Sequence, residues 1–262
     1  MKKIIFILTC FLWLNANAQN KPLIFKGRFF TTDQTGSYYE ITSNQIFKTG
    51  KNGQRQFTYS NNILGEISSV DVSNPMKIIV FFKEFSKVVV LDNTLTEQGG
   101  VLDLNEVSLE ETSLVCSSYN NGVWYYNPIK YQLTRIENTT NITNTSANIS
   151  TLLNINIQPN FLVEFNNRVY LNDSTNGILV FDIYGTYIKT IPIFGLTSFQ
   201  VKEKYLLYVN QQGNIETYDF FTLEKTVFKP LQYSNIKMVR IENKTIYIIN
   251  SKNELIQDTI EL

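Results

Sequence analysis

Short apolar runs separated by polar turns make up the chain after Pro22. Asn, Gly, Ser and Asp fill the breaks between the runs, and no long stretch keeps the period of an amphipathic helix. Aromatic and β-branched residues are common in the runs, and such residues favour strands. Regularly spaced short strands with turn residues between them are typical of an all-β sandwich, barrel or propeller.

An apolar–Tyr–apolar core that closes on Asn repeats along the chain. The tyrosines of three close copies lie 38 and 39 residues apart, and this spacing suits a four-stranded propeller blade. A looser copy, "GVWYYN", lies upstream at Gly122–Asn127. The close copies are "RVYLND" (Arg168–Asp173), "YLLYVN" (Tyr205–Asn210) and "TIYIIN" (Thr245–Asn250).

The segments on either side of these cores repeat as well. An apolar segment comes before each core, as in "PNFLVEF" (Pro159–Phe165), "LTSFQVK" (Leu196–Lys202) and "IKMVRIE" (Ile236–Glu242). A strand that ends on an aspartate follows the core in several copies, at Asp92, Asp182 and Asp219. Adding an outer strand to these three elements makes a four-stranded antiparallel meander.

Asp182 is interpreted as a turn residue rather than a catalytic acid. An aspartate at the first position of a turn accepts hydrogen bonds from backbone N–H groups two or three residues on. Gly185 then suits the end of a type I turn. We therefore expect a hairpin between Ile178–Phe181 and Tyr187–Ile191.

The stretch "ILVFDIYGTYIKTI" (Ile178–Ile191) resembles the repeat of NHL-type and related six-bladed β-propellers, such as TolB-like ones. The turns after Asp92 and Asp219 match the acid of that repeat but lack its glycine. The resemblance implies an all-β propeller of six four-stranded blades. The short leader and the Asn-, Ile- and Lys-rich composition are similar to those of exported bacterial proteins of the Bacteroidetes type.

The repeat also predicts the blade boundaries. The strand "PLIFKGRFF" (Pro22–Phe30) precedes the first blade, and we expect it to join the last blade and close the ring, because an open ring would leave an unpaired edge. The expected blades are 38–60, 66–104, 113–138, 159–193, 196–230 and, with only three strands, 236–262. "GKNGQ" (Gly50–Gln54) and Gly99–Gly100 are expected to be turns.

The polar segment Asn138–Gln158 interrupts the repeat. It has no aromatic residue and is rich in Asn, Ser and Thr. We expect either a long surface loop between blades three and four, or a degenerate outer strand followed by a loop. Long loops in compact domains are often functional.

The N-terminus predicts export. Two lysines precede the apolar run Ile4–Leu14, and small residues follow at Ala16 and Ala18. This pattern is typical of a signal peptide cleaved after Ala18, which leaves residues 19–262 as a single propeller domain, periplasmic or associated with the cell surface. The alternatives are an uncleaved membrane anchor and lipid attachment at Cys10. No later run is long enough for a transmembrane helix.

Composition narrows the choice of partner. Hydrophobic residues make up 43% of the chain and aromatics 13%, enough to build a core. The formal net charge is zero, and no basic cluster stands out. Nucleic-acid binding needs concentrated positive charge, so it is disfavoured.

The residue types argue against most catalytic chemistry. The chain contains no histidine, which excludes Ser-His-Asp and Cys-His catalysis and histidine metal sites. The mature chain keeps one cysteine, Cys116, which we interpret as a buried thiol, with a reactive thiol as the alternative. We assign no catalytic, cofactor-binding or metal-binding residue.

Carboxylates remain as the possible catalytic groups. Glycoside hydrolysis needs two acids that face each other across a cleft, and nothing in the sequence marks such a pair. A calcium site near "LNDSTNG" (Leu171–Gly177) lacks the spacing of an EF-hand loop. The acids near predicted turns are Asp33, Asp71, Glu84, Asp173 and Glu203.

The sequence therefore favours an exported, non-catalytic propeller that acts as a protein-binding or scaffold module. The expected partner is another envelope or outer-membrane protein. A glycan- or small-ligand-binding propeller is the first alternative, because "VWYYN" and "SYYEI" hold more aromatic residues than one strand face buries. A glycan-active enzyme that uses carboxylates alone is the second.

Overall fold

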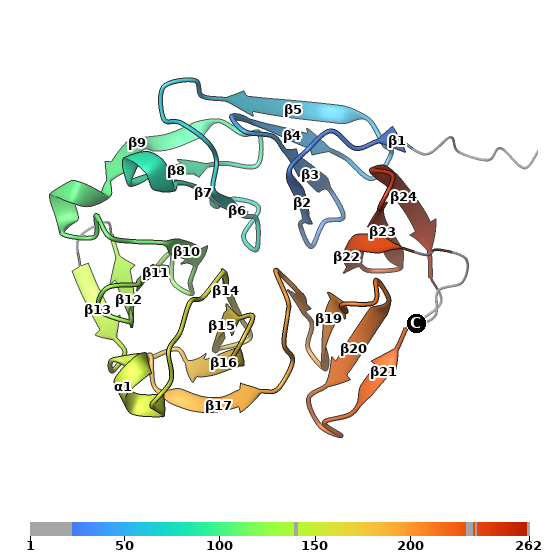
Figure 1. Cartoon of the computed structure of the whole chain (residues 1–262). Helices are drawn as coiled ribbons and strands as arrows, with labels where there is room; N and C mark the ends of the chain where they lie inside the picture. Colours follow the sequence, from blue (N-terminus) through green and yellow to red (C-terminus); the bar gives the residue numbers. More distant parts are fainter. Residues whose placement is uncertain (1–22, 139–140, 229–232, 234, 261–262) are drawn as a thin grey trace, which may run out of the picture.

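The structure is a computed structural model, and it describes residues 23–138, 141–228, 233 and 235–260. Six four-stranded sheets are arranged in a ring (Figure 1). All the strand pairs within the sheets are antiparallel, for example β15 with β16. The chain folds as a six-bladed β-propeller, which confirms the predicted fold class. The predicted signal peptide, residues 1–18, lies outside the described residues.

The blades follow one another along the chain, and each has the form of a meander. Blade one contains β2 (Phe29–Thr32), β3 (Tyr38–Ile41), β4 (Gln45–Thr49) and β5 (Arg55–Ser60). Blade two contains β6 (Ser69–Asp71), β7 (Ile78–Phe82), β8 (Lys87–Leu91) and β9 (Glu97–Asp103). Blade three contains β10 (Leu114–Ser117), β11 (Val123–Asn127), β12 (Gln132–Glu137) and β13 (Asn141–Thr145).

The second half of the ring repeats this plan. Blade four contains β14 (Phe161–Phe165), β15 (Arg168–Asp173), β16 (Gly177–Asp182) and β17 (Tyr187–Ile191). Blade five contains β18 (Gln200–Val201), β19 (Tyr205–Val209), β20 (Ile215–Asp219) and β21 (Lys225–Val227). Blade six contains β22 (Ile236–Glu242), β23 (Thr245–Asn250), β24 (Glu254–Thr259) and, as its outer strand, β1 (Leu23–Ile24).

The strand β1 closes the ring by pairing with β24, where Ile24 lies opposite Glu254. The prediction that Pro22–Phe30 forms one closing strand is wrong in its extent, because its last two residues belong to β2 and begin blade one. The chain reverses close to Gly27, where a Cβ would lie 2.7 Å from the Phe25 ring and 2.9 Å from the Ile41 carbonyl oxygen. Glycine allows this close approach.

The polar segment after blade three contains regular structure. The outer strand β13 extends blade three to Thr145 rather than to Asn138 as predicted. A short helix, α1 (Ile149–Leu153), follows, and the Asn148 side chain caps it by accepting a hydrogen bond from the Thr151 N–H at 2.8 Å. The outer strand of the second alternative is present, but the segment after it contains a helix and is not only a loop, so the long surface loop is wrong. The helix was not predicted, because one turn is too short to show a helical period.

Gly99 and Gly100 are not a turn as predicted. Both lie inside β9 with φ angles of 76° and 82°. The pairing of β9 with β8 shifts register between Val89 and Leu91, so the two glycines form a bulge in the outer strand. The predicted turn at Gly50–Gln54 is confirmed between β4 and β5.

The aspartate turn of blade four has the predicted geometry. One Asp182 carboxylate oxygen accepts hydrogen bonds from the N–H groups of Tyr184 at 2.9 Å and Thr186 at 2.8 Å. Gly185 has a φ of 84°, a left-handed conformation that favours glycine. Leucines with positive φ angles end the other two turns, Leu95 three residues after Asp92 and Leu223 four residues after Asp219.

The core lies between the blades rather than in one central layer. Apolar side chains of facing sheets form separate buried clusters at successive blade interfaces. Cys116 is fully buried in one cluster, and burial raises the pKa of its thiol well above the ordinary value. The interpretation of Cys116 as a buried thiol is confirmed. Among the residues that the structure describes, no helix is long and apolar enough to cross a membrane.

Candidate functional site

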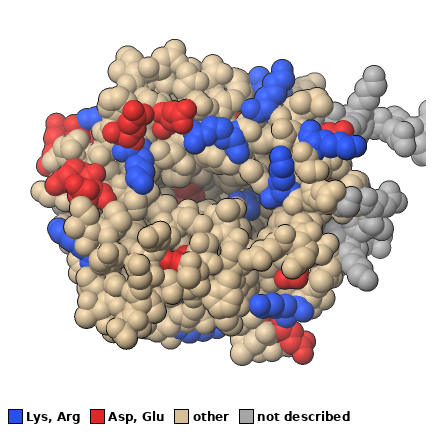
Figure 2. Space-filling model, viewed as in Figure 1, with Lys and Arg blue, Asp and Glu red and all other residues tan. Residues whose placement is uncertain are grey.

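Two faces of the propeller differ in which connections they carry. Because successive strands are antiparallel, the turns between first and second strands and between third and fourth strands emerge on one face. We call this the turn face; it carries the turns at 33–37, 166–167, 183–186 and 220–224. The opposite face carries the remaining connections, α1 among them. A space-filling view shows the central hollow of the disk and charged groups of both signs around it (Figure 2).

Polar side chains near the ends of the innermost strands tie neighbouring blades together. The Glu242 carboxylate at the end of β22 accepts hydrogen bonds from Thr32 Oγ1 at 2.8 Å and Gln200 Nε2 at 2.7 Å. It also forms an ion pair with Lys202 Nζ at 2.9 Å. One buried carboxylate thus joins blades one, five and six.

Glu164 has the same role between blades three and four. Its carboxylate accepts hydrogen bonds from Trp124 Nε1 at 2.7 Å, Ser118 Oγ at 2.5 Å and the Tyr119 N–H at 3.0 Å. Carboxylate acceptors satisfied in this way stabilise one relative position of the blades.

A polar hollow surrounds Glu164, and we call it the channel-mouth pocket. Its volume is about 330 Å³, and hydroxyl and amide groups dominate its lining. Its members come from the first turns of blades two and three and include Ser73, Asn74, Ser118, Tyr119 and Asn121.

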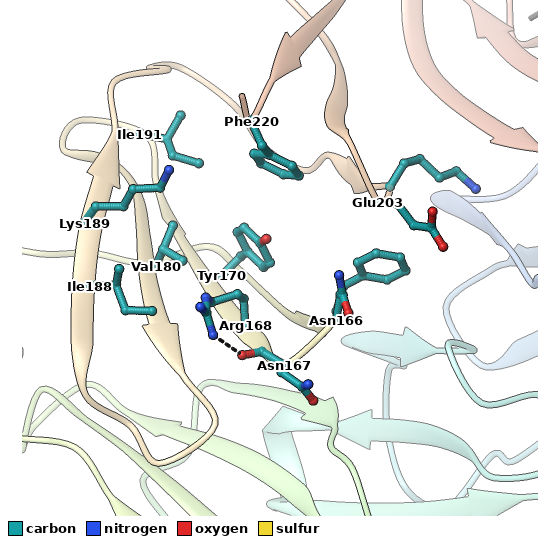
Figure 3. Close-up of a pocket in the computed structure, with 12 residues that line it drawn as sticks. Asn166, Asn167, Arg168, Tyr170, Val180, Ile188, Lys189, Ile191, Glu203 and Phe220 are labelled. Carbon is teal, nitrogen blue, oxygen red and sulfur yellow. Dashed lines mark hydrogen bonds between the residues drawn. The ribbon is translucent and has the colours of Figure 1, made fainter. Parts of the chain in front are cut away.

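A second hollow of about 350 Å³ opens between blades four and five, and we call it the interblade cleft. It is formed by β15 to β17 on one side and by the β18–β19 turn and the end of β20 on the other. Figure 3 shows Val180, Ile188, Lys189 and Ile191 on blade four, with Glu203 and Phe220 facing them from blade five.

The floor of the interblade cleft is apolar. Tyr170, Val180 and Ile191 are buried there, as part of the cluster that holds blades four and five together. The ring of Phe220 stacks on Tyr170 with the centroids 6.2 Å apart. Burial raises the pKa of Tyr170 to about 12, although the nearby Arg168 guanidinium lowers it. The tyrosine hydroxyl is therefore neutral at physiological pH.

The rim of the cleft carries more positive than negative charge. Arg168 Nη1 donates to the Asn167 carbonyl oxygen at 2.9 Å. Within the described parts of the chain, neither Arg168 nor Lys189 forms an ion pair. Lys202, which also lines the cleft, is neutralised by Glu242. Glu203 is the acid in the lining, so the two free cations outnumber it.

Large apolar side chains are exposed on the outer strand of blade four and in the outer turns of blades four and five. Ile188 on β17 is 43% exposed, and Phe221, just beyond Phe220, is 78% exposed. Tyr184 and Leu223, in the turns between the third and fourth strands of blades four and five, are 62% and 58% exposed. Concentrated exposed apolar groups of this kind mark interaction surfaces.

The five acids selected from the sequence do not form a pair. Asp33 is buried in the β2–β3 turn, where it accepts from the Thr35 N–H at 2.9 Å and the Tyr39 hydroxyl at 2.8 Å. Asp173 is buried at the end of β15, where it accepts from the Gln158 N–H at 2.6 Å. Their carboxylates hold local structure.

The other three acids are also separate. Asp71 ends β6 and accepts from the Ser117 N–H of blade three at 2.8 Å. Glu84 lies in a single 3-10 turn, Lys83–Phe85, on the face opposite the turn face. Glu203 lines the interblade cleft. Within the described ranges, no group of three or more His, Cys, Asp or Glu side chains could hold a metal ion.

Sequence reasoning missed the residues that matter most at these hollows. Glu164 interrupts the apolar strand "FLVEF", and Glu242 ends the strand "MVRIE"; an acid at such a position was a usable signal. Arg168 begins one copy of the repeated core and carried no such signal. Only the packing of blade five against blade four places it beside a cleft.

Comparison with known proteins gives matches of structure but not of sequence. No family model matches the chain, and no curated protein sequence matches it. Virginiamycin B lyase from Staphylococcus aureus, in complex with quinupristin, is 12% identical with a TM-score of 0.59, over 88% of this chain and 80% of that one. That structure is of a catalytically inactive variant in which a histidine is replaced by alanine.

Two further structures have a similar propeller. BBS1N in complex with ARL6DN is 13% identical with a TM-score of 0.53, over 86% of this chain and 75% of that one. PorZ of Porphyromonas gingivalis is described as an essential bacterial surface component of the type-IX secretion system. It is 10% identical with a TM-score of 0.50, over 86% of this chain and 32% of that one. At these identities the similarity shows the fold alone.

Proposed function

We propose that this protein is an exported, non-catalytic β-propeller that binds another envelope or outer-membrane protein. In this proposal residues 1–18 direct export, and residues 19–262 form the mature propeller of NHL-like type from a bacterium of the Bacteroidetes group. The binding surface is the turn face of blades four and five. The mature protein works in the periplasm or at the cell surface.

The observation that carries the proposal is the interblade cleft with its exposed apolar surroundings. A cleft of this size falls within the range of ligand sites. Phe221 follows Phe220 of the lining and is exposed, and Tyr184 and Leu223 are exposed in turns of the same two blades. An apolar centre with a charged rim is the usual composition of a protein-binding surface.

Catalysis of the lyase type has no support in this chain. It contains no histidine, the residue type whose replacement gives the inactive lyase variant. The carboxylates at the channel, Glu164 and Glu242, are occupied by hydrogen bonds between blades. A propeller bound to a protein and another at a bacterial surface show that the fold serves such roles elsewhere.

Site-directed photocrosslinking in intact cells tests the proposal. A benzoylphenylalanine at position 221 replaces an aromatic residue that is 78% exposed on the turn face. The matched control is position 129, where Ile129 is 65% exposed on the opposite face. We expect one adduct with an envelope protein, identified by mass spectrometry, from position 221 and not from 129. Absence of an adduct at 221, or equal labelling from both positions, contradicts the proposal.

A glycan- or small-ligand-binding role is the second candidate, and the channel-mouth pocket favours it. Hydroxyl and amide groups line this pocket, and they suit sugar hydroxyls. Trp124 donates to Glu164, which lies in the lining, and it is the one tryptophan outside the predicted signal peptide. Saturable changes in its fluorescence with an oligosaccharide panel are expected if this role holds. A flat titration would remove the candidate.

A further inference from the structure

We propose that the interblade cleft binds an acidic peptide segment that carries one bulky apolar side chain. The apolar side chain enters the cleft, and neighbouring carboxylates contact Arg168 and Lys189. This inference rests on the proposed protein-binding function and specifies the chemistry of the partner segment.

The shape and lining of the cleft favour a single large side chain. The floor combines the buried side chains Tyr170, Val180 and Ile191 with the ring of Phe220. An apolar side chain that enters the cleft removes its own surface from water, together with the exposed parts of Phe220 and Ile188. Aromatic side chains give the largest gain because they bury most area and pack edge-on or stacked against other rings.

The charge of the rim favours carboxylates. Arg168 uses one nitrogen to hold the Asn167 carbonyl oxygen, and its remaining N–H groups bond to no other described residue. Lys189 lies on β17 and likewise has no described partner. An arginine fork binds a carboxylate through two parallel hydrogen bonds. A basic or neutral segment would leave both cations without a counter-charge.

Two amide side chains suit the backbone of a peptide. Asn166 and Asn167 form the β14–β15 turn with φ angles of 48° and 58°, and both line the cleft. Their side-chain amides bond to no other residue that the structure describes. Each amide offers both a donor and an acceptor, which matches the alternating N–H and C=O groups of an extended peptide.

Binding is tested by fluorescence anisotropy with the mature, untagged protein and defined peptides. The probe carries the core Glu-Phe-Glu between Gly-Ser spacers, with blocked ends and a fluorescein label. One control peptide has the core Glu-Ala-Glu and lacks the anchor, and the other has the core Lys-Phe-Lys. We expect saturable binding of the probe, weakened by added salt, and binding at least about tenfold weaker for both controls.

Variants distinguish binding in the cleft from nonspecific attraction to the positive charge of the surface. Arg168→Gln removes the fork, and we expect it to weaken binding about tenfold, because hydrogen bonds between charged groups are strong. Lys244→Gln is the matched control, an exposed lysine in the first turn of blade six on the same face. Lys189→Glu should lower affinity for the acidic probe and raise it for the basic peptide. Unchanged Trp124 emission checks that each variant is folded.

The outcomes distinguish this inference from the proposed function. Equal binding of the three peptides, or equal loss in Arg168→Gln and Lys244→Gln, overturns the inference. A photocrosslinked envelope partner together with no peptide binding leaves the proposed function standing and refutes only the cleft chemistry. Binding of free phenylacetate as tightly as the probe identifies the cleft as a small-molecule site and also overturns the inference.

Discussion

At the scale of single residues, Glu164 contributes most clearly to the position of one blade against the next. It accepts hydrogen bonds from a ring nitrogen, a hydroxyl and a backbone N–H of blade three. Trp124 is fully buried, and Ser118 and Tyr119 are partly buried. Removal of the carboxylate should therefore lower the free energy of unfolding by more than one average hydrogen bond contributes, because the donors are left without this partner.

We expect Glu164→Ala to lower the free energy of unfolding by about 2–4 kcal/mol, because it leaves these donors unsatisfied. Urea unfolding followed by Trp124 emission measures it, and the emission of the native state should also shift. Glu203→Ala removes a carboxylate that bonds to no described residue, and it should change stability by less than about 0.5 kcal/mol. Similar losses in both variants would show that Glu164 is not a structural link.

Residue identity also explains why the blade turns are unequal. Leu223 has a φ of 61°, in the left-handed region where a residue with a Cβ is strained. Its side chain is 58% exposed, so burial offsets little of this strain. We expect Leu223→Gly to raise the free energy of unfolding by up to about 1 kcal/mol. Gly185→Ala, at φ 84°, should lower it by about 1 kcal/mol. Thermal unfolding that gives the same sign for both changes would contradict this.

At the scale of elements, ring closure depends on a very short strand and the residue after it. The strand β1 has two residues, and Phe25 follows with 6% of its surface exposed. Phe25 packs in the cluster between blades six and one, edge-on to Phe30 at 6.2 Å. Side-chain burial at this junction therefore supplements a small number of backbone hydrogen bonds.

We expect a mature chain that begins at Lys26 to be less stable than one that begins at Lys21, and to self-associate, because the edge of β24 is left unpaired. Phe25→Ala in the longer chain isolates the packing contribution and should cost about 3–5 kcal/mol. Calorimetry and size-exclusion chromatography measure the two effects. If the truncated chain stays monodisperse with an unchanged melting temperature, β1 does not close the ring.

At the scale of the whole molecule, the ionisable groups predict how stability depends on pH. The Lys87 ammonium lowers the pKa of Asp103 from its ordinary 3.8 to about 2. The stabilisation of the folded state by the ionised Asp103 is present above pH 3.8 and is lost as the pH falls towards 2. Burial raises the pKa of Tyr170 from 10.0 to about 12, so its contribution is present below pH 10 and is lost as the pH rises towards 12.

Without histidine, no side chain has an ordinary pKa between about 5 and 8. We therefore expect a flat free energy of unfolding from about pH 5.5 to 8.5. Urea unfolding across this range measures it, on protein without a histidine tag. A change greater than about 1 kcal/mol inside the range would show that a group with a strongly shifted pKa has been overlooked.

The sequence by itself determined the architecture and the absence of histidine chemistry. The spacing of the tyrosine cores and the aspartate turns depends on strand length and on hydrogen bonds within a few residues, so these features could be predicted locally. Such reasoning could not divide Pro22–Phe30 into β1 and β2, because the division depends on contacts with blade six, at the far end of the chain.

Only the tertiary structure decided where the hollows lie and what they contain. Arg168 and Lys189 belong to blade four, whereas Glu203 and Phe220 belong to blade five, and their shared cleft depends on how closely two sheets pack. Glu164 and Glu242 became links between blades because their partners lie about one or more blade repeats away in the sequence. Local patterns report which face of a strand is buried, but not which distant side chain meets it there.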